Sequence, residues 1–249
     1  MAGRKIAILG KAPDSLVGAP VNDESWEIWT INDSVYRGQV TRWTRHFELH
    51  PIEWTKEAAY DKYFDWLCEK HDQPIVLREA VEAVVSGIAY PRAEVIGHFA
   101  GPGADYFTNT ISWMLALAIW ELDVAGDKEG EIGLWGVNMA QHGIGGKSEY
   151  AKQRPSCEFW AGMARGRGYT FHLPDASDLL KTGVLYGFDQ GGMLWTKMRE
   201  RDKELQGRID TAAQMKERCG QEELFLRGAL ECNHYWKQWI NDTREEPAK

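Results

Sequence analysis

The sequence has no long hydrophobic run and few cysteines. Its longest apolar stretch, residues 111–120, is far shorter than the roughly 20 residues that a membrane-spanning helix needs. The amino terminus lacks the apolar segment of a secretory signal, and the 4 cysteines are scattered without a Cys-x-x-Cys pair. These absences exclude a small disulfide-stapled scaffold, and we expect a cytoplasmic protein with reduced thiols and no membrane contact.

Several catalytic motifs are also missing. The chain contains no G-x-G-x-x-G, no P-loop, no G-x-S-x-G, no D-x-D pair and no His, Cys and Asp cluster at metal-ligand spacing. The sequence therefore predicts neither a catalytic metal nor a cofactor, so a bound nucleotide would be a substrate. A formal net charge of -8 over 249 residues disfavours DNA as a partner unless a local basic patch exists.

Short apolar runs that end in Gly or a polar residue alternate with helical patterns along the first three quarters of the chain. Such alternation predicts an α/β fold with a mostly parallel sheet flanked by helices. The Gly- and Pro-rich residues 87–105 indicate an irregular loop. The predicted strands are residues 5–10, 27–32, 47–50, 74–78, 131–138 and 169–173, and the predicted helices are residues 57–70, 111–122 and 157–165.

The carboxyl-terminal part of the chain has a different texture. Between residues 194 and 240, charged residues alternate with apolar ones at intervals of three and four, with a break at Gly220. This pattern predicts an α-helical hairpin or a coiled coil, and we expect a sheet domain at 1–190 and a hairpin at 191–249. The hairpin is either an oligomerisation arm, which makes the protein a homo-oligomer, or a cover for its own sheet domain.

Candidate functional residues follow the predicted strands. Ligands of open parallel sheets bind beyond the carboxyl ends of the strands. Among the residues there, His50 suits a general base, although a surface histidine before a turn fits equally well. Gly10 is either a cradle for a ligand or a tight turn. On the first interpretation, a Gly10→Val change blocks ligand approach with little loss of fold, provided that φ at this turn is negative.

Two further stretches could bind phosphate. Residues 108–110 open an apolar helix, whose free N–H groups attract anions, although a simple N-cap explains the same residues. Residues 142–150 form a Gly-rich segment that suits a lid, and Arg154 follows as a cation that could neutralise phosphate. The alternatives are a flexible surface connection and an ordinary ion pair.

The order of these stretches resembles a known family. Residues 5–16 (KIAILGKAPDSL), Asn32, residues 108–110 (TNT), residues 132–138 (IGLWGVN) and residues 157–180 are similar to the nucleotide-binding half of the bacterial sialyltransferases that use CMP-sialic acid. The resemblance covers most of residues 4–180. A second resemblance is to uncharacterised proteins of tailed bacteriophages, in the sequences of residues 47–51, 106–111, 149–150 and 153–155. It would place the protein in a host cytoplasm.

The sialyltransferase resemblance implies a Rossmann-like sheet that holds a nucleotide. It implies that Gly10 and Pro13 lie near the phosphates, Asn32 near the base or ribose, and Thr110 near a phosphate. Gly136 and Asn138 would line the nucleotide pocket. The chain departs from the family in its opening, which lacks G-x-G-P-S-L, in Asn138 where the family has an acidic residue, and in a short lid, so that nucleotide binding is better supported than sialyl transfer.

These observations lead us to expect a metal-independent, nucleotide-sugar-dependent glycosyltransferase whose acceptor is a hydroxyl of modified phage DNA or of a glycan. The alternatives are a nucleotide-binding or nucleotide-sequestering protein without turnover and a structural assembly protein. The candidate catalytic residues are His50, Glu48 and His142. The candidate nucleotide-binding residues are Gly10, Lys11, Pro13, Asn32, Asn109, Thr110, Gly136, Asn138 and Arg154.

Overall fold

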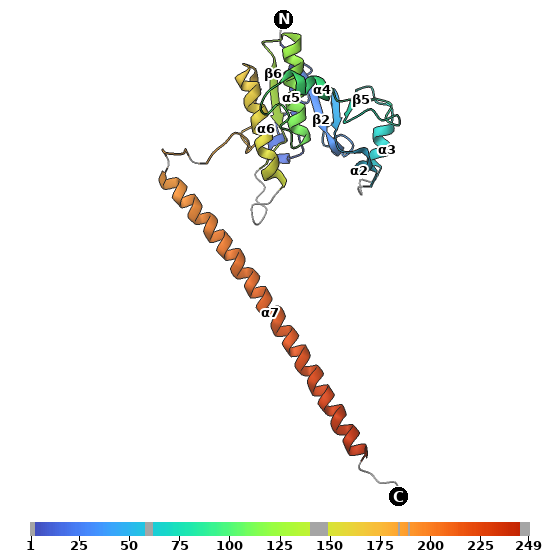
Figure 1. Ribbon diagram of the computed structural model, residues 1–249, viewed down its shortest axis with the longest axis vertical. Helices are drawn as coiled ribbons and strands as arrows, with labels where there is room; N and C mark the ends of the chain where they lie inside the picture. The colour runs from blue at the N-terminus through green and yellow to red at the C-terminus, as the bar shows by residue number, and fades with distance from the viewer. Residues whose placement is uncertain (1–2, 58–61, 140–148, 184, 189, 245–249) are drawn as a thin grey trace. The chain divides into compact units, whose positions relative to one another are not determined.

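The computed structural model describes residues 3–57, 62–139, 149–183, 185–188 and 190–244. The chain divides into two units, Met1–Lys181 and Thr182–Lys249. The first unit is an α/β sheet domain, and the second contains the single helix α7 (Gln190–Arg244) (Figure 1). None of the helices within the described ranges is long and apolar enough to span a membrane.

The sheet has 7 strands, all parallel, in the order β5-β4-β3-β2-β1-β6-β7. The predicted α/β class with a parallel sheet is confirmed. The central strands are buried on both faces, as expected when helices or loops cover each side. The strands are β1 (Lys5–Leu9), β2 (Trp26–Ile31), β3 (Arg45–Glu48), β4 (Ile75–Leu77), β5 (Gly87–Ala89), β6 (Glu131–Trp135) and β7 (Thr170–His172).

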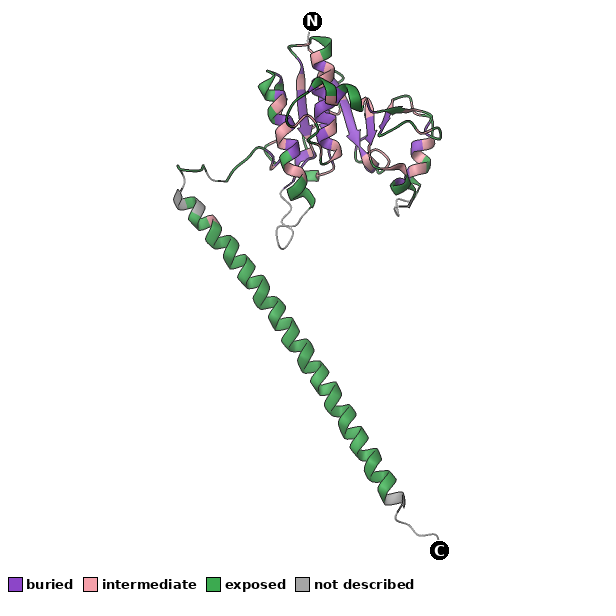
Figure 2. Cartoon of the chain, viewed as in Figure 1, coloured by how far each residue is buried: buried purple, intermediate pink, exposed green. Residues whose placement is uncertain are grey.

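One face of the sheet carries the larger part of the core. Helix α5 (Thr110–Ala125) packs on it together with α6 (Glu149–Gly166) and α4 (Arg92–His98), and the alternate β1 residues Ile6 and Ile8 point into this layer (Figures 1 and 2). Side chains nearly all around α5 are buried, which explains its continuous apolar sequence.

The opposite face is covered by short elements. Ala7 and Leu9 of β1 pack with Val40 and with residues around the short helix α1 (Pro13–Leu16). Near the β4 edge, a second cluster includes Tyr63 and Leu67 of α3 (Tyr63–Cys68). Helix α2 (Ile52–Glu57) precedes α3 in the chain.

Two segments of the sheet domain differ from the prediction. The predicted helix 57–70 is wrong in its bounds, because one helix ends at residue 57 and another starts at residue 63. The predicted loop 87–105 contains both β5 and α4. Its Gly and Pro residues lie at the element ends: Gly87 begins the edge strand, and Pro91 precedes the first turn of α4, a place where proline is tolerated.

The predicted hairpin is instead one continuous helix of 55 residues. Gly220 lies inside this helix and does not adopt the left-handed conformation that ends helices. A glycine within a helix costs only about 1 kcal/mol relative to alanine, so the surrounding strong helix formers continue the helix through it. The charged and apolar pattern was therefore correct evidence for helix, and only the turn at Gly220 was wrong.

Candidate functional site

The strand order places a crevice between the ends of β1 and β6. From β1 the chain adds strands β2 to β5 on one side, whereas β6 and β7 lie on the other side of β1. The connections after neighbouring strands therefore diverge at this point, which is where open α/β sheets bind ligands. Gly10 and Gly136 follow β1 and β6 here.

Gly10 and Gly136 bring two backbones into close approach. The Gly10 N–H donates to the Trp135 carbonyl at 2.7 Å, and the Ala12 N–H donates to the Gly136 carbonyl at 2.8 Å. A Cβ atom at Gly10 would lie 2.3 Å from the Gly136 carbonyl oxygen. Gly10 is therefore required by the packing of two chain segments, and the expectation that Gly10→Val leaves the fold intact is wrong.

A cavity of about 1140 Å³ opens at these strand ends. This volume is enough for a nucleotide with an attached sugar, since drug-sized ligands occupy pockets of roughly 300–1,000 Å³. Its lining comes from the carboxyl ends of β1, β2, β3 and β6, with the segments that follow them, and from the start of α5. The predicted site residues that line it are Gly10, Lys11, Pro13, Asn32, His50, Asn109, Thr110, Gly136 and Asn138.

Two asparagines present unpaired amide oxygens in this lining. The Oδ1 atoms of Asn32 and Asn138 are buried and have no hydrogen-bond partner within the described part of the chain. Asn32 follows β2 and adopts a left-handed conformation with φ of 49°, which asparagine tolerates better than most residues. An unmade hydrogen bond at a buried oxygen costs about 1–3 kcal/mol, so both atoms are exceptions to the usual pairing of buried polar groups.

The start of α5 forms the wall opposite the sheet. The Asn109 side chain caps the helix by accepting a hydrogen bond from the Ser112 N–H at 2.9 Å. The Asn109 amide nitrogen lies 3.2 Å from Cys157 Sγ of α6, so this side chain is fully used in holding two helices together. The N-cap interpretation of Asn109 is therefore confirmed, and phosphate binding at this helix start stays a prediction, with the first-turn residues Thr110 and Ile111 bordering the cavity.

His50 is held by a buried carboxylate. Its Nδ1 lies 2.7 Å from Glu48 Oε1, and the same oxygen accepts the His50 backbone N–H at 3.1 Å. The Glu48 side chain is 2% exposed, whereas the His50 side chain is 44% exposed and lines the cavity. Donation from Nδ1–H to Glu48 leaves the lone pair on Nε2, so that His50 has the tautomer of a general base.

A buried polar chain supports Glu48 from behind. The Tyr63 hydroxyl donates to Glu48 Oε2 at 3.1 Å and lies 3.1 Å from His46 Nε2, whose Nδ1 lies 2.9 Å from the Thr30 hydroxyl. Both Glu48 oxygens are therefore occupied, which fixes the orientation of the carboxylate. Tyr63 is a positioning residue that the sequence analysis missed, because it lies 15 residues from Glu48 in a separate helix.

The pKa values of His46 and His50 are shifted in opposite directions. The hydrogen bond to Glu48 raises the pKa of His50 above its usual value, against a smaller opposing effect of burial, and the charges of Glu48 and Glu149 add to the increase. Burial lowers the pKa of His46 to about 3, and the nearby His71 contributes in the same direction. His46 is therefore neutral near pH 7, which suits its hydrogen bonds to two hydroxyl groups.

Aromatic and acidic residues complete the lining. The exposed Trp54 ring stacks on His50, with centroids 6.1 Å apart, and Tyr150 borders the cavity from the first turn of α6. Asp178 accepts the Met139 N–H with both carboxylate oxygens, at 2.8 and 3.0 Å, and so holds the segment after β6. No motif in the sequence connects Asp178 with residue 139, so only the fold could reveal this contact.

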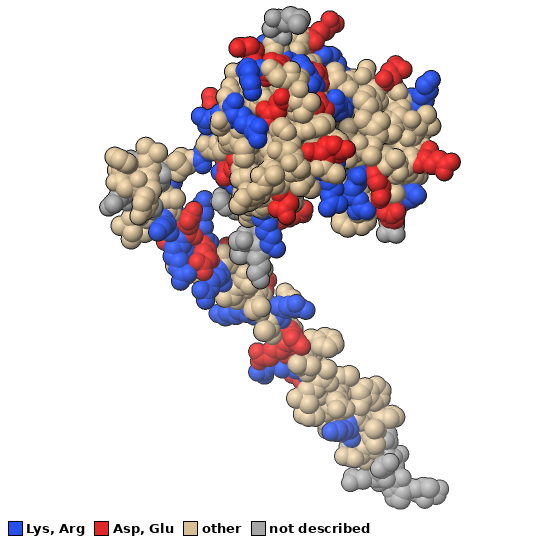
Figure 3. Space-filling view, turned by 45° about the horizontal axis from the view of Figure 1, so that its top comes forward, with Lys and Arg blue, Asp and Glu red and all other residues tan. Residues whose placement is uncertain are grey.

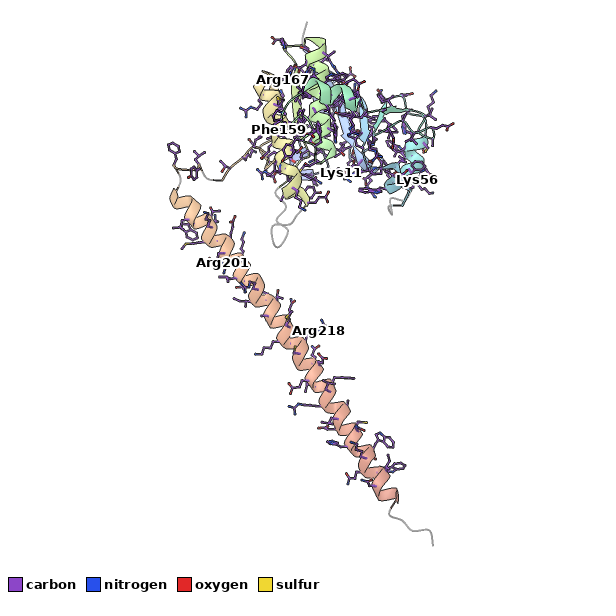
Figure 4. The ribbon with its side chains drawn as sticks, viewed as in Figure 1. Lys11, Lys56, Phe159, Arg167, Arg201 and Arg218 are labelled. Carbon is purple, nitrogen blue, oxygen red and sulfur yellow. The ribbon has the colours of Figure 1, made fainter. Side chains whose placement is uncertain are left out.

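The remaining predicted residues have other positions. Arg154 is not part of the cavity lining: its guanidinium bonds Glu158 at 2.9 Å and the Asp178 carbonyl at 2.8 Å, because its position on α6 faces the 178–181 segment. The ion-pair alternative is therefore correct. Lys11 extends from the end of β1 and pairs with Asp33 (Figure 4). His142 lies outside the described residues.

Across the described ranges, no group of three or more His, Cys, Asp or Glu residues is arranged to hold a metal ion. Among the described residues, the cations that border the cavity are Lys11 and His50, each beside a carboxylate. Anion binding in this cavity would therefore depend mainly on backbone N–H groups at the start of α5.

No protein-family model and no curated protein sequence matches this chain. Solved structures of the sialyltransferase CstII from Campylobacter jejuni are similar to it. The complex with CMP-3FNeuAc has 11% identity and a TM-score of 0.42, over 73% of this chain and 93% of that chain. The complex with cytidine-5'-monophosphate has 11% identity and a TM-score of 0.44, over 74% and 89%.

A third structure, CST-II with a trisaccharide acceptor and CMP, has 11% identity and a TM-score of 0.41, over 71% of this chain and 89% of that chain. The matched structures are sialyltransferases, the family that residues 4–180 resemble. At this identity and TM-score, the likeness carries no conclusion about the activity of this chain.

Proposed function

We propose that the protein binds a nucleotide-sugar in the cavity between β1, β6 and α5 and transfers the sugar to a hydroxyl acceptor without a metal ion. The buried, unpaired amide oxygens of Asn32 and Asn138 carry this proposal. A nucleobase amine, a ring N–H or a ribose hydroxyl supplies the donor that each oxygen lacks. The cavity volume of about 1140 Å³ and its place at the diverging strand connections support the same ligand class.

In this proposal, His50 is the general base. Its Nε2 takes the proton of the acceptor hydroxyl, the acceptor oxygen bonds to the anomeric carbon, and the bond from that carbon to the nucleotide phosphate oxygen breaks. The electron pair leaves with the phosphate, which the start of α5 at Thr110 stabilises. Glu48 orients the imidazole and stabilises the imidazolium that forms.

The acceptor is proposed to be a glycan hydroxyl. Carboxylates of Asp14, Glu149 and Asp178 border the cavity, and they would repel the phosphates of a DNA acceptor. The net charge of -8 acts in the same direction. A neutral hydroxyl has no such penalty, and the exposed ring of Trp54 offers the apolar surface on which sugars stack.

Calorimetry against a panel of nucleotides and nucleotide-sugars tests ligand binding. We expect Asn138→Ala to weaken the affinity of the best ligand about tenfold, which corresponds to one lost hydrogen bond. Asn241→Ala on the exposed surface of α7 is the matched control and should leave the affinity unchanged. Absence of binding by every nucleotide would refute the proposal and favour a structural role.

Release of free nucleotide from the best donor tests turnover. His50→Ala is expected to lower the rate by about 10²–10⁴-fold while leaving donor affinity within about twofold. Tight binding of a nucleotide with no consumption of any sugar donor would instead indicate a nucleotide-sequestering protein. This outcome would support the proposed binding site and refute the proposed transfer reaction.

We further propose that α7 mediates self-association. From residue 197 to residue 241 every side chain of this helix is exposed, including Ile209, Leu226 and Leu230 (Figure 2). Apolar side chains repeated along one helix face favour burial against another helix.

A further inference from the structure

Helix α7 carries a repeat of seven residues along one face. Starting from Met198, every seventh position is Met, Leu, Ala, Cys, Leu, Asn or Ile, so that six of the seven side chains are apolar or small (residues 198, 205, 212, 219, 226, 233 and 240). The positions three residues earlier hold Trp, Asp, Ile, Lys, Glu, Leu and Lys (residues 195, 202, 209, 216, 223, 230 and 237). We call these two rows together the seam.

The charges in the seam distinguish between the two ways of pairing two copies. In a parallel, in-register dimer each seam residue faces its own copy. Asp202 would face Asp202 of the second copy, and Lys216, Glu223 and Lys237 would likewise meet identical charges. Four layers of like charge oppose that arrangement, since such contacts act against pairing.

We propose that α7 pairs antiparallel with α7 of a second copy of this chain, centred between residues 217 and 218. This inference rests on the proposed self-association. In an antiparallel pair, a residue of one row shares a layer with a residue of the other row of the partner. The layers are Trp195 with Ile240, Asp202 with Asn233, Ile209 with Leu226, Lys216 with Cys219, Glu223 with Ala212, Leu230 with Leu205, and Lys237 with Met198.

This register removes every like-charge layer. Three layers combine two large apolar residues, and Asp202 meets Asn233, whose amide can donate to the carboxylate. Lys216 and Lys237 lie opposite uncharged residues, and their long stems can carry the ammonium groups out to solvent. The centre also coincides with the middle of the helix, Gln190–Arg244, so that the two copies overlap along their whole length.

The surface outside the seam carries charged residues together with exposed apolar side chains such as Leu224 and Phe225. Charged residues of both signs crowd the first half of the helix, whereas the part towards its carboxyl end is mostly uncharged (Figure 3), and side chains project from the helix along its length (Figure 4). Arg227, which lies outside the seam, pairs with the seam residue Glu223 at 2.8 Å within one helix. The occupant of the seam therefore has to supply apolar side chains, and a second α7 supplies them at the matching positions.

Cysteine crosslinking of the full-length chain tests the orientation. In a background with Cys68, Cys219 and Cys232 changed to Ser, Leu205→Cys and Leu230→Cys are made separately and coexpressed with tags of different size. The antiparallel register predicts a crosslink between the two different chains on oxidation or with a short bis-maleimide, and no crosslink within either variant alone. Residues 205 and 230 are roughly 37 Å apart along one helix, so the outcomes are distinct.

Other outcomes overturn the proposal. Crosslinks within each single variant would indicate a parallel dimer. A monomeric mass by light scattering, or an intrachain crosslink in the double variant, would indicate a helix that folds back on itself or stays unpaired.

A matched pair of leucines tests the seam itself. Leu226→Glu is expected to convert the dimer to a monomer, whereas Leu224→Glu, two residues away and 71% exposed but outside the seam, is expected to leave the dimer intact. Equal effects of the two changes would refute the seam. Nucleotide affinity is measured in the same samples, so failure of this pairing is distinguishable from failure of the proposed activity.

Discussion

The sheet domain and α7 use apolar residues in opposite ways. In the sheet domain, Ile6, Ile8 and Leu9 of β1 have no solvent exposure, and α5 buries side chains nearly all around its axis. In α7, Leu226 is 59% exposed although it is as apolar as any residue of β1. Helices in proteins owe most of their stability to packing, and within its own unit α7 has no packed core.

The comparison also concerns polar groups. Around the candidate site, Glu48, Tyr63 and His46 satisfy one another within the core, while the buried oxygens of Asn32 and Asn138 have no hydrogen-bond partner among the described residues. Polar groups of α7 are paired locally along the helix, as in Arg227 with Glu223. Under the proposals made above, a ligand would supply the missing partners in the first unit, whereas a second helix would supply them for α7.

The largest expected difference between the two units comes from a pair of glycines. Gly10→Ala forces a Cβ atom to within 2.3 Å of a backbone oxygen, and we expect a loss of about 3 kcal/mol or more in the free energy of unfolding. At Gly220 no atom lies within 4 Å of the added Cβ, so Gly220→Ala should stabilise α7 by about 0.5–1 kcal/mol. Urea unfolding of both variants measures this; similar effects at the two sites would contradict the comparison.

Acid sensitivity should belong to the sheet domain and depend on His46. Its pKa of about 3 lies below the unfolded value near 6.5, so the unfolded chain binds a proton that the folded chain refuses. Stability from this group is complete above pH 6.5 and falls by up to about 1.4 kcal/mol per pH unit as the pH decreases towards 3.

Urea midpoints between pH 7 and pH 4.5 test this dependence. His46→Gln is the informative variant, because glutamine can keep a hydrogen bond without titrating; it should be less stable at pH 7 but lose less stability on acidification. The helical signal of α7 provides an internal reference. An unchanged slope in His46→Gln would assign acid sensitivity to other groups.

Much of the sheet was predictable because buried parallel strands are short apolar runs, and because their carboxyl ends meet at one edge. Gly10, which follows a predicted strand, was accordingly expected at this edge, and the family resemblance implied Asn32 and Asn138 there; all three line the cavity. The bonds of Arg154 to Glu158 and the 178–181 segment were not predictable, since the direction of a side chain on α6 depends on tertiary packing.

Other features depended on contacts distant in sequence. Strand β5 has three residues at the sheet edge and no apolar run of its own to mark it. Tyr63 and Asp178 reach the site only through the fold. The hairpin prediction was wrong because a glycine can end a helix or lie within one, and the sequence around Gly220 permits both.

The smallest expected effect is the pH dependence of stability that comes from His50. This residue lies four positions after His46, and its pKa is shifted in the opposite direction. Its folded pKa is raised by Glu48, so the stabilisation from this pair is complete below pH 6.5 and is lost as the pH rises through the folded pKa. The His50 side chain is 44% exposed, so screening by solvent keeps the contribution to folding small.

Turnover should change in the opposite direction over the same window, because the base is active only when neutral. Glu48→Gln removes the charge that raises the pKa, and we expect the acidic limb of the rate profile to shift towards lower pH while the maximal rate falls, since the imidazolium loses its stabilising carboxylate. Asp14→Asn, which removes a cavity carboxylate remote from the His50 hydrogen bonds, is the control and should leave the limb in place. A limb that stays in place in Glu48→Gln would show that another group acts as the base.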